Sequence, residues 1–445
     1  MKAEILCIQP PVYDFALYDL FFKPYGLLSI AGWLQEGGYR VPFLNALDYE
    51  DARTVRALGR VRRKSDGTGK FHRMRAELPE GIRPIRRRFG RYGVLPEVLE
   101  EKIRRAHPDV VLVTSQMTYW YPGVVEAVEM VKRHHPGVPV IVGGVYATLM
   151  PEHCRRVTGA DEVVAGDGFS RLPEILARYG LESPAKLPPP SAAVPVMDPG
   201  VWKQAGILRL NRGCPFHCTY CASRILEPDF QAGDFRMVFE WMRELHTRYR
   251  IRNFAFYDDA LLFDRERVLL PLLEEVIRRE LDLRFFTPNA VHMRYIDAET
   301  ASLMKRAGFR EVRLGYESAD EEFHRQLDRK YSPEEVPQAI KVLRRAGFTG
   351  RQLLLYVLAG LPGQRVSEVE RTLHIVSRYK VKVSIAEYSP VPRTGLWPEA
   401  VRDSSYPVES EPLYHNNTFF PMEWEGFTRD DMQRVKALSH ELEVR

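Results

Sequence analysis

Three cysteines lie close together near the middle of the chain. Cys214, Cys218 and Cys221 follow the spacing C-x3-C-x2-C. Thiolates at short spacings are the usual ligands of iron–sulfur clusters, and three of them would hold a [4Fe–4S] cluster with one iron left free for another ligand. A structural zinc site would need a fourth ligand, usually from a second C-x2-C or H-x3-H pair, and the sequence contains no such pair. The spacing therefore predicts a three-cysteine cluster.

The other two of the five cysteines, Cys7 and Cys154, have no spacing that suggests a site. A disulfide framework is not expected, although buried or disulfide-forming loop cysteines remain the alternative to a cluster. Odd cysteine usage without a signal peptide favours the reducing cytosol, so we expect a cytoplasmic protein. No apolar run approaches the roughly 18 residues of a membrane span.

The cysteine segment resembles the cluster motif of the radical SAM superfamily, in which an aromatic residue, here Tyr220, precedes the last cysteine. The resemblance implies that the free iron binds the amino and carboxylate groups of S-adenosylmethionine (SAM). An electron from the cluster would then cleave the sulfonium to a 5'-deoxyadenosyl radical. On this basis we expect Cys214, Cys218 and Cys221 to be metal ligands and catalytic residues, and the Tyr220 backbone to contact adenine.

Length and composition predict more than one domain. A chain of 445 residues exceeds one ordinary core, and 45% hydrophobic with 28% charged residues is typical of a globular protein. Residues 184–199 are rich in proline and alanine, which indicates a domain boundary. We expect an N-terminal domain over residues 1–183, a linker over 184–203, a second domain over 204–395 and a C-terminal tail over 396–445.

Short apolar runs alternate with helical patterns in the first half, as in the helix expected at residues 123–134. This alternation predicts an α/β fold with a Rossmann-like, doubly wound parallel sheet, where ligands bind at the carboxyl ends of the strands. Glycines there would let the backbone approach a flat or phosphate-bearing ligand. The expected strands are residues 4–8, 110–114, 138–144 and 162–166, and the expected strand ends are 114–120, 143–146 and 166–168.

Taken with the cysteine motif, this half resembles the cobalamin-binding domain of class B radical SAM enzymes. The resemblance rests on a hydroxyl-rich strand end, a Gly-Gly pair and a Gly-Asp-Gly sequence. It implies that cobalamin binds in this domain. The residues expected to contact it are Ser115, Thr118, Tyr119, Trp120, Gly143, Gly144, Tyr146, Gly166 and Gly168.

The first strand end lacks the D-x-H-x-x-G sequence of methionine-synthase-like cobalamin domains, because residues 9–15 read QPPVYDF. No histidine is therefore offered to the lower face of cobalt. One interpretation is cobalamin bound with its own base displaced and no protein ligand on cobalt, with Met117, Tyr119 and Trp120 covering that face. The other is a Rossmann-like lid that binds no corrin, since a fold does not guarantee its ligand. The aromatic residues are equally consistent with core packing.

Residues 51–105 form a basic insertion with seventeen Lys or Arg and seven Asp or Glu, a net charge of +10 in a chain whose total is +5. The segment is longer and more charged than a crossover requires. A solvated helical insertion is one interpretation, because charge runs are usually exposed faces. Contact with an anion, such as the cobalamin phosphate, the SAM carboxylate or an acidic substrate, is the other. Nucleic acid is not expected, since no recognised binding module accompanies the charge.

Strand–helix alternation restarts after the linker. The strand at residues 206–210 leads into the cysteine loop, and a helix at 239–249 follows. Six βα steps suit an open, partial (β/α)6 TIM barrel, which is also the fold that the radical SAM resemblance implies. The remaining expected strands are residues 253–257, 284–287, 311–315, 352–358 and 383–387.

Polar residues follow these strands, at the barrel edge where chemistry concentrates. By the resemblance, Asp258 or Asp259 would accept a hydrogen bond from the SAM ammonium. Asn289 and Glu317 would hold ribose or methionyl groups, roles that suit an amide and a carboxylate. For each single residue the alternative is a helix cap or a turn.

A glycine and a proline follow the fifth expected strand, and by the resemblance Gly360 and Pro362 would shape the wall against adenine. From Arg393 onward the pattern predicts loop and a terminal helix over residues 428–444, capped by Thr428. The aromatic residues of this tail are expected to cover the barrel, and some could line a substrate pocket.

The resemblance implies a cobalamin-dependent radical SAM enzyme that methylates an unactivated carbon. The deoxyadenosyl radical would abstract hydrogen, methylcobalamin would supply the methyl group, and a second SAM would remethylate Co(I). Alternatives are a cobalamin-using cyclase or rearrangement enzyme without net methyl transfer, a radical SAM enzyme whose first domain binds no corrin, and a cobalamin or SAM sensor. A methylthiolase-like enzyme would need more N-terminal cysteines than Cys7.

The expected partners follow from the same reasoning. The aromatic tail and the basic insertion permit a small-molecule substrate with an apolar body and an acidic group. The resemblance implies an electron donor such as flavodoxin or ferredoxin. Neither nucleic acid nor a membrane span is expected.

Overall fold

The computed structural model describes residues 3–181, 186–190, 193–332 and 334–442. The chain forms two compact units, the first over residues 1–205 with 247–251 and the second over residues 206–246 with 252–445. Each unit is built on its own parallel sheet.

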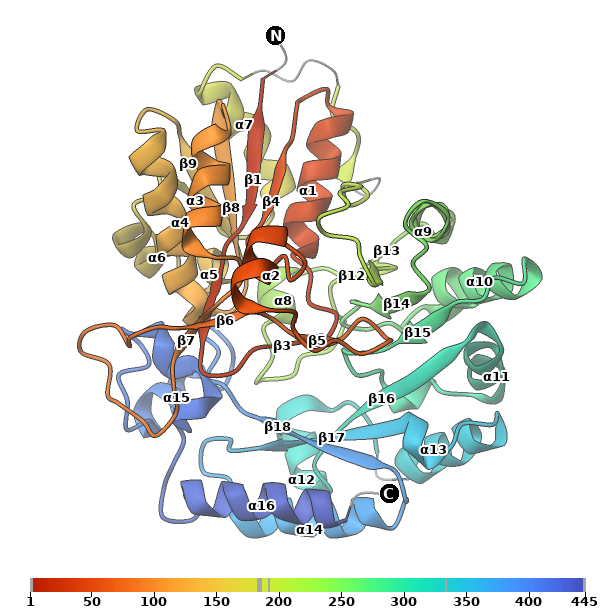
Figure 1. Cartoon of the computed structure of the whole chain (residues 1–445). Coiled ribbons are helices and arrows are strands. Elements are labelled where there is room, and N and C mark those ends of the chain that lie inside the picture. Colours follow the sequence, from red (N-terminus) through yellow and green to blue (C-terminus); the bar gives the residue numbers. More distant parts are fainter. Residues whose placement is uncertain (1–2, 182–185, 191–192, 333, 443–445) are drawn as a thin grey trace. The chain divides into compact units, whose positions relative to one another are not determined.

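The sheet of the first unit has five strands in the order β10-β9-β8-β1-β4 (Figure 1). In chain order the strands lie 2-1-3-4-5, a doubly wound arrangement, which confirms the predicted α/β class. The short second strand was not predicted, because it has only three residues and no apolar run of its own. The strands are β1 (Ile5–Gln9), β4 (Phe43–Asn45), β8 (Val110–Ser115), β9 (Val140–Gly144) and β10 (Glu162–Val163).

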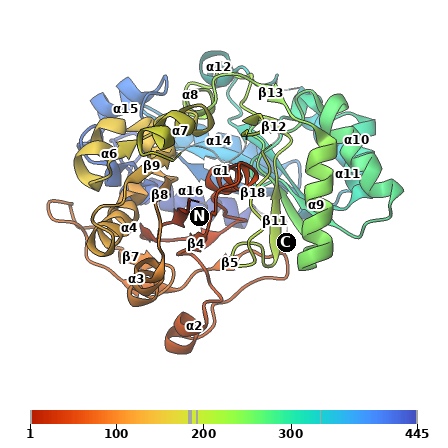
Figure 2. The same cartoon turned by 90° about the horizontal axis from the view of Figure 1, so that it is seen from above.

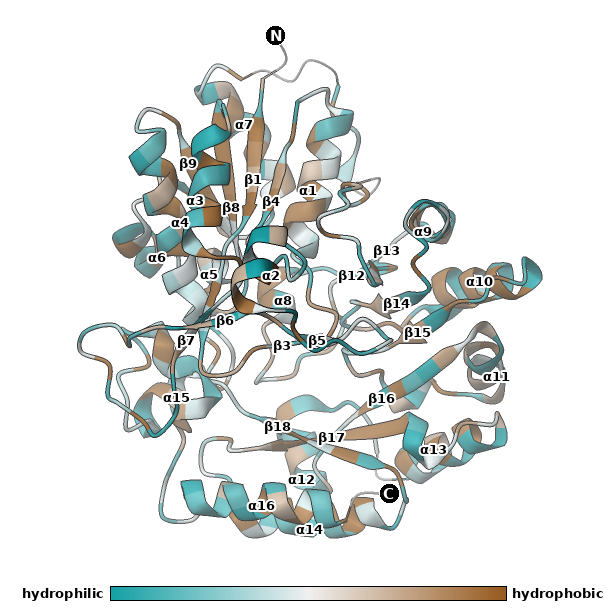
Figure 3. Cartoon of the chain, viewed as in Figure 1, coloured by the Kyte–Doolittle hydropathy of each residue, from teal (hydrophilic) through white to brown (hydrophobic). Residues whose placement is uncertain are grey.

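Helices cover both faces of this sheet, so its central strands β1 and β8 are buried throughout. Seen from above, α3 and α4 lie on one face and α1 and α7 on the other (Figure 2). The buried strands are hydrophobic and the outward helix faces are hydrophilic (Figure 3). The helices are α1 (Tyr25–Glu36), α3 (Pro96–Arg105), α4 (Tyr121–His134), α5 (Val145–Leu149), α6 (Pro151–Thr158) and α7 (Gly168–Arg178).

The basic insertion is mostly not helical, and in this respect the helical interpretation is wrong. After α2 (Ala52–Leu58), strands β5 (Gly69–Lys70), β6 (Arg73–Arg75) and β7 (Gly90–Tyr92) form two small antiparallel sheets with β2 (Val12–Asp14) and β3 (Tyr18–Asp19). Several of its arginines have structural partners. Arg63 pairs with Asp19 at 2.7 Å and Arg91 with Glu126 at 2.8 Å.

The described part of the proline-rich linker packs on α1. The Trp33 indole donates to the Pro188 carbonyl at 2.7 Å, and the Val196 amide donates to the Leu28 carbonyl at 2.9 Å. Residues 184–185 and 191–192 of the predicted linker lie outside the described residues. The linker residues that are described therefore belong to the packed part of the first unit.

The second unit has a six-stranded sheet whose strands follow chain order, as predicted for a (β/α)6 barrel. Its helices α9, α10 and α11 lie side by side along the outside (Figures 1 and 2). The strands are β11 (Ala205–Leu208), β14 (Asn253–Phe256), β15 (Arg284–Phe286), β16 (Phe309–Glu317), β17 (Leu353–Ala359) and β18 (Lys382–Glu387), and the helices between them are α9 (Phe235–Tyr249), α10 (Arg265–Arg278), α11 (Ala298–Ala307), α13 (Glu335–Arg345) and α14 (Val366–Ser377).

The C-terminal tail packs against the end of this unit. Helix α16 (Arg429–Glu441) contacts α14 and β18. Thr428 caps it, as predicted, in a capping box with Asp431, and the end of the predicted helix lies outside the described residues. Phe419 and Phe427 are almost fully buried, so these tail aromatics pack within the unit.

Candidate active site

The cysteine loop begins where β11 ends, and Asp258 holds its start. The carboxylate of Asp258 accepts hydrogen bonds from the amides of Leu210, at 3.0 Å, and Asn211, at 2.6 Å. Burial raises the pKa of Asp258 to about 7. Asp258 therefore ties the end of the second barrel strand to the loop that carries the cysteines.

Gly213, directly before the first cysteine, has a φ of +72°. A Cβ there would lie 2.3 Å from the Asp229 carbonyl oxygen, so a side chain cannot be accommodated. Its amide donates to the Glu227 carboxylate at 2.9 Å. A glycine and a carboxylate thus set the path of the chain into Cys214.

The three cysteines are free thiols in one loop, with Cys214 buried, Cys218 half-buried and Cys221 exposed. Burial raises the pKa of Cys214 to about 11 and that of Cys218 to about 12, while Lys330 opposes both shifts. Bound iron would hold such thiols as thiolates. Among the described residues no three His, Cys, Asp or Glu converge on a single metal ion. In a cubane each thiolate binds a different iron, so the donor set fits the cluster.

Polar atoms beside the cysteines are enclosed without protein partners. Both amide atoms of Asn211 and the hydroxyl of Thr219 have no hydrogen-bond partner among the described residues. Buried polar groups are rarely left unsatisfied, so a bound group at this loop would account for these three atoms.

Tyr220 links the cysteine loop to a one-turn π-helix at His324–Asp328. Its hydroxyl donates to Asp328 at 2.8 Å, and the other oxygen of Asp328 lies 2.9 Å from Nδ1 of His324. The Thr219 amide donates to the Leu327 carbonyl at 2.8 Å. π-turns are rare and frequently lie at functional sites. Here the π-turn buttresses the segment between the last two cysteines.

Glu317 ends β16 and forms an ion pair with Lys330, with 2.9 Å between Oε1 and Nζ. Both side chains are largely buried, at 11% and 13% exposure. Glu317 has a φ of +62°, an uncommon conformation for a non-glycine residue at a strand end. The Lys330 ammonium also lies 5.3 Å from the centre of the Tyr220 ring. Lys330 was not predicted, because it lies thirteen residues beyond Glu317, outside any strand.

The remaining barrel residues of the prediction lie at the same strand ends. Asp259 is half-buried and hydrogen bonded to Ser223, and burial raises its pKa. Asn289 is exposed and donates to the Tyr257 carbonyl at 3.1 Å. Gly360 packs against the tail, since a Cβ there would lie 2.9 Å from the Phe420 ring, and Pro362 is half-buried beside it.

In the first unit, side-chain hydroxyls connect the ends of three strands. Ser115, at the end of β8, donates to the Gly143 carbonyl at 2.8 Å. Thr148 donates to the Gly144 carbonyl at 2.8 Å and accepts from the Gly166 amide at 3.0 Å. The predicted strand ends are therefore joined in one network.

The glycines of these strand ends have different roles. A Cβ on Gly144 would lie 2.2 Å from the Ser115 carbonyl oxygen, so close strand packing requires this glycine. A Cβ on Gly166 would meet nothing within 4 Å, and one on Gly143 would meet only the Val164 carbonyl oxygen, at 3.9 Å. The backbone at Gly143 and Gly166 is thus open to close approach by a ligand. Gly168 begins α7 and is half-buried.

The aromatic residues after β8 are mainly structural. Trp120 is buried, and its indole donates to Asp14 at 2.6 Å. Thr118 is buried as well, whereas Tyr119 is half-buried and Met117 is 46% exposed. Met117 and Tyr119 are thus the members of this group that a ligand could contact.

Tyr146 is fully buried, and its hydroxyl lies 2.6 Å from Nδ1 of His153. Burial lowers the pKa of His153 to about 4 from a usual value of 6.5. Tyr146 thus supports the Gly143–Gly144 turn from the interior and presents no surface to a ligand.

We expect His153 to make the folded protein less stable in acid. Between about pH 6.5 and pH 4 the unfolded chain binds a proton that the folded chain does not, so the free energy of unfolding falls as pH falls, by up to about 3 kcal/mol. Urea unfolding of the parent and of His153→Leu at pH 7 and pH 4.5 measures the effect, and the variant should lose less. An identical pH dependence of both proteins would contradict it.

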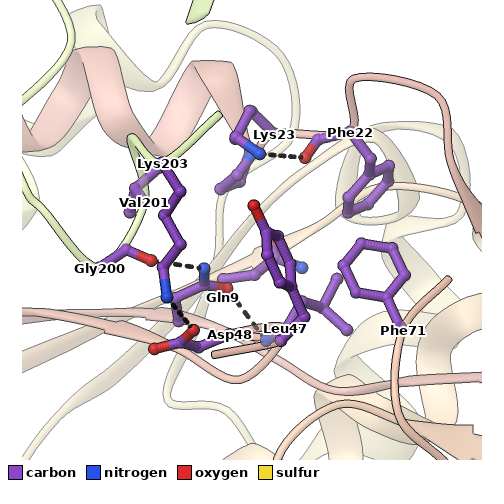
Figure 4. Close-up of a pocket in the computed structure, with 12 residues that line it drawn as sticks. Gln9, Phe22, Lys23, Leu47, Asp48, Phe71, Gly200, Val201 and Lys203 are labelled. Atoms are coloured by element: carbon purple, nitrogen blue, oxygen red, sulfur yellow. Dashed lines mark hydrogen bonds and ion pairs between the residues drawn. The ribbon is translucent and has the colours of Figure 1, made fainter. Parts of the chain in front are cut away.

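A small pocket lies at the carboxyl ends of β1 and β4 (Figure 4). Gln9 and Asn45 come from the strand ends, and Lys23 and Lys203 enter from the sides. Lys203 pairs with Asp48, and burial lowers the pKa of Lys23. These residues were not predicted, since none belongs to a motif. Polar residues therefore lie at the carboxyl ends of β1 and β4 as well as at those of β8, β9 and β10.

Two family models match the chain. The model of the radical SAM superfamily matches residues 208–376, and that of the B12-binding domain matches residues 91–176. The chain is a radical SAM enzyme with a B12-binding domain. Its cofactors are a [4Fe–4S] cluster, SAM and cobalamin, as predicted. The radical SAM match contains the cysteine loop, and the B12-binding match contains the hydroxyl-linked strand ends.

Two curated relatives align with at least two thirds of this chain at modest identity. The uncharacterized methyltransferase PH0819 of Pyrococcus horikoshii is 25% identical over 376 residues, 76% of this chain and 77% of the relative. The anaerobic magnesium-protoporphyrin IX monomethyl ester cyclase of Cereibacter sphaeroides is 24% identical over 341 residues, 68% of this chain and 55% of the relative.

A solved structure has the same fold as this radical SAM enzyme. The radical SAM methyltransferase TsrM of Kitasatospora setae, solved with cobalamin and a [4Fe–4S] cluster, aligns with a TM-score of 0.70 over 98% of this chain and 91% of TsrM, at 15% identity. Among the described residues no helix has the length and apolar character that a membrane crossing requires.

Proposed function

We propose that this enzyme methylates an unactivated carbon of a small-molecule substrate. The observation that carries the proposal is the presence of both a radical SAM match and a B12-binding match in one chain, because forming a substrate radical alone needs no corrin. The names of PH0819 and TsrM support methyl transfer. When bound, the cluster and SAM supply a hydrogen-abstracting radical, and cobalamin supplies a transferable methyl group.

Cys214, Cys218 and Cys221 would hold the cluster. Asp258 and Tyr220 position this loop from either side, through the Leu210 and Asn211 amides and through Asp328. Positioning of this kind fixes reacting groups without itself taking part in the chemistry.

SAM would be held by side chains at the barrel strand ends. The Asp258 carboxylate already accepts hydrogen bonds from two backbone amides. We therefore assign the hydrogen bond from the SAM ammonium to Asp259. The Lys330 ammonium donates a hydrogen bond to Oε1 of Glu317. Oε2 of Glu317 would accept a hydrogen bond from a ribose or methionyl group of SAM. Asn289 is exposed at the neighbouring strand end, and Gly360 and Pro362 would form the adenine wall.

Cobalamin would bind at the strand ends of the first unit. The open backbone at Gly143 and Gly166 suits a flat macrocycle, and Met117 and Tyr119 offer apolar contact. Residues 10–17, after β1, contain no histidine, and Asp14, the last residue of β2, accepts a hydrogen bond from Trp120. We therefore place no histidine on the lower face of cobalt.

The test uses the full chain, reconstituted anaerobically with iron, sulfide and cobalamin, then reduced in the presence of SAM carrying a deuterated methyl group. We expect both 5'-deoxyadenosine and S-adenosylhomocysteine by mass spectrometry, since radical formation and methyl transfer consume SAM differently. Absence of 5'-deoxyadenosine would refute the radical reaction. Formation of 5'-deoxyadenosine without S-adenosylhomocysteine would refute methylation.

A cyclase or rearrangement reaction without net methyl transfer is the second candidate. The relative named as a magnesium-protoporphyrin ester cyclase favours it, since that protein aligns over 68% of this chain. In the labelled-SAM experiment this candidate predicts 5'-deoxyadenosine alone.

The partners proposed for the enzyme follow from the cluster. A small electron carrier such as flavodoxin or ferredoxin would reduce it. Free thiols at Cys214, Cys218 and Cys221 need a reducing compartment, for which we propose the cytoplasm.

A further inference from the structure

A polar cluster lies inside the barrel sheet, below the Glu317–Lys330 ion pair. A Cβ on Gly315 would lie 3.0 Å from Oε1 of Glu317 and 3.9 Å from Nζ of Lys330. Gly315 therefore faces the site. Because strand residues alternate between faces, Arg313 and Glu311 face it too.

The strand register extends this face across two more strands. Gly315 is paired with Tyr356, and Tyr356 with Ser384. Two residues earlier on each strand, Leu354 of β17 is paired with Arg313 on one side and with Lys382 on the other. The opposite face is apolar, since Val312 and Leu314 are completely buried.

Two cations share one carboxylate in this cluster. Nε of Arg313 lies 2.6 Å from Glu311, whose other oxygen is 3.5 Å from the Lys382 ammonium. The Arg313 guanidinium also donates through Nη1 to the Tyr356 hydroxyl, which itself donates to the Pro288 carbonyl at 3.3 Å. The cluster therefore has one more positive than negative charge.

Hydrogen-bond donors remain available on the same face. Among the described residues Nη2 of Arg313 and the hydroxyl of Ser384 have no partner, and neither is a fully enclosed atom. The three charged side chains are 14% to 31% exposed. The donors are therefore accessible yet partly shielded from water, which strengthens charge-assisted hydrogen bonds.

We propose that Arg313 and Lys382 form a subsite for an anionic oxygen group of the substrate, with Ser384 as a neutral donor. The proposal rests on the proposed function and specifies its substrate class: a molecule with a carboxylate or phosphate that anchors below the SAM site. The free Nη2 of Arg313 and the Lys382 ammonium can each donate a charge-assisted hydrogen bond to either oxyanion. The reacting carbon would then lie between this anchor and the strand ends.

Calorimetric titration of the full chain with phenylacetate, inorganic phosphate and the neutral phenylacetamide tests the subsite. We expect at least one anion to bind ten times or more tightly than phenylacetamide. Preference for phenylacetate identifies a carboxylate anchor, and preference for phosphate identifies a phosphate anchor. Equal affinity for all three probes overturns the proposal.

Variants locate the binding. We call the ratio of anion affinity to phenylacetamide affinity the anion preference. Arg313→Gln should lower this ratio at least tenfold. Lys382→Gln should lower it less, and Arg313→Lys should retain part of it. The matched control is Arg310→Gln, since Arg310 lies on the same strand but is exposed on the opposite face. Loss in the control equal to that in Arg313→Gln overturns the proposal. If Arg313→Gln does not fold, the titrations of the parent and of Lys382→Gln still test whether this subsite binds the anion.

Failure of this subsite is distinguishable from failure of the proposed function. Probe binding requires no SAM cleavage, so missing anion preference with normal SAM products would refute the subsite alone.

Discussion

Replacing Cys214, Cys218 and Cys221 together with alanine will abolish the iron–sulfur absorbance of the anaerobically reconstituted protein, and with it the reductive cleavage of SAM. Thiolates are the usual ligands of such clusters, and these three lie in one loop whose start is fixed by Asp258 and Gly213. Iron and sulfide content, the visible absorbance of the cluster and 5'-deoxyadenosine formation measure the loss.

Cys7 and Cys154 provide matched controls. Both are fully buried in the first unit, and burial raises the pKa of Cys154 to about 12. Alanine at either position should leave a complete cluster, because neither sulfur belongs to the cysteine loop. A full cluster in the triple variant, or its loss in the control variants, would refute the assignment.

Breaking the Glu317–Lys330 pair will destabilise the second unit strongly. Glu317→Gln or Lys330→Met leaves one largely buried charge without its partner, and such losses are about 3 to 5 kcal/mol. The double variant should be destabilised by less than the sum of the two, since it leaves no unpaired charge. Urea unfolding of the four proteins gives the coupling energy.

A surface pair is the control for this experiment. Arg371 and Asp320 lie 2.8 Å apart with the arginine 56% exposed, so Arg371→Ala should change stability by less than about 1 kcal/mol. Additive effects of the Glu317 and Lys330 variants would mean that the pair is not coupled. SAM binding supplies a second measurement, because Glu317→Gln replaces a charged acceptor with a neutral amide, and loss of a charge-assisted hydrogen bond lowers affinity by about tenfold or more.

The ligand set proposed for the cluster is a prediction that the sequence supports by itself, because the three cysteines are local. Three cysteines within one loop need only a short turn to converge, and the spacing alone distinguishes a three-thiolate cluster from a zinc site. The barrel was predictable for a related reason. Its strands alternate with helical patterns along the chain, and short connections place successive units side by side.

Prediction failed where the local pattern was weak. Strand β4 has three residues, too few for a periodic signal. The charge of the basic insertion suggested a solvated helix, yet its Arg63 and Arg91 form ion pairs with Asp19 and Glu126, which lie far away in the sequence.

The roles of individual site residues depended on tertiary contacts. Asp258 and Asp259 are equivalent in sequence, and only the position of the Leu210 and Asn211 amides makes Asp258 a structural latch. Lys330 and Arg313 belong to no sequence motif, so only their contacts in the folded chain indicate a role for them.

The sequence by itself therefore determined the two domains built on parallel sheets and predicted the three cysteines as cluster ligands, because these follow from hydrophobic period and from spacing. The tertiary structure decided which polar side chains at the strand ends remain free to bind a ligand. A hydrogen bond or ion pair that occupies a side chain joins residues far apart in the chain, and its existence depends on distances that no local pattern encodes.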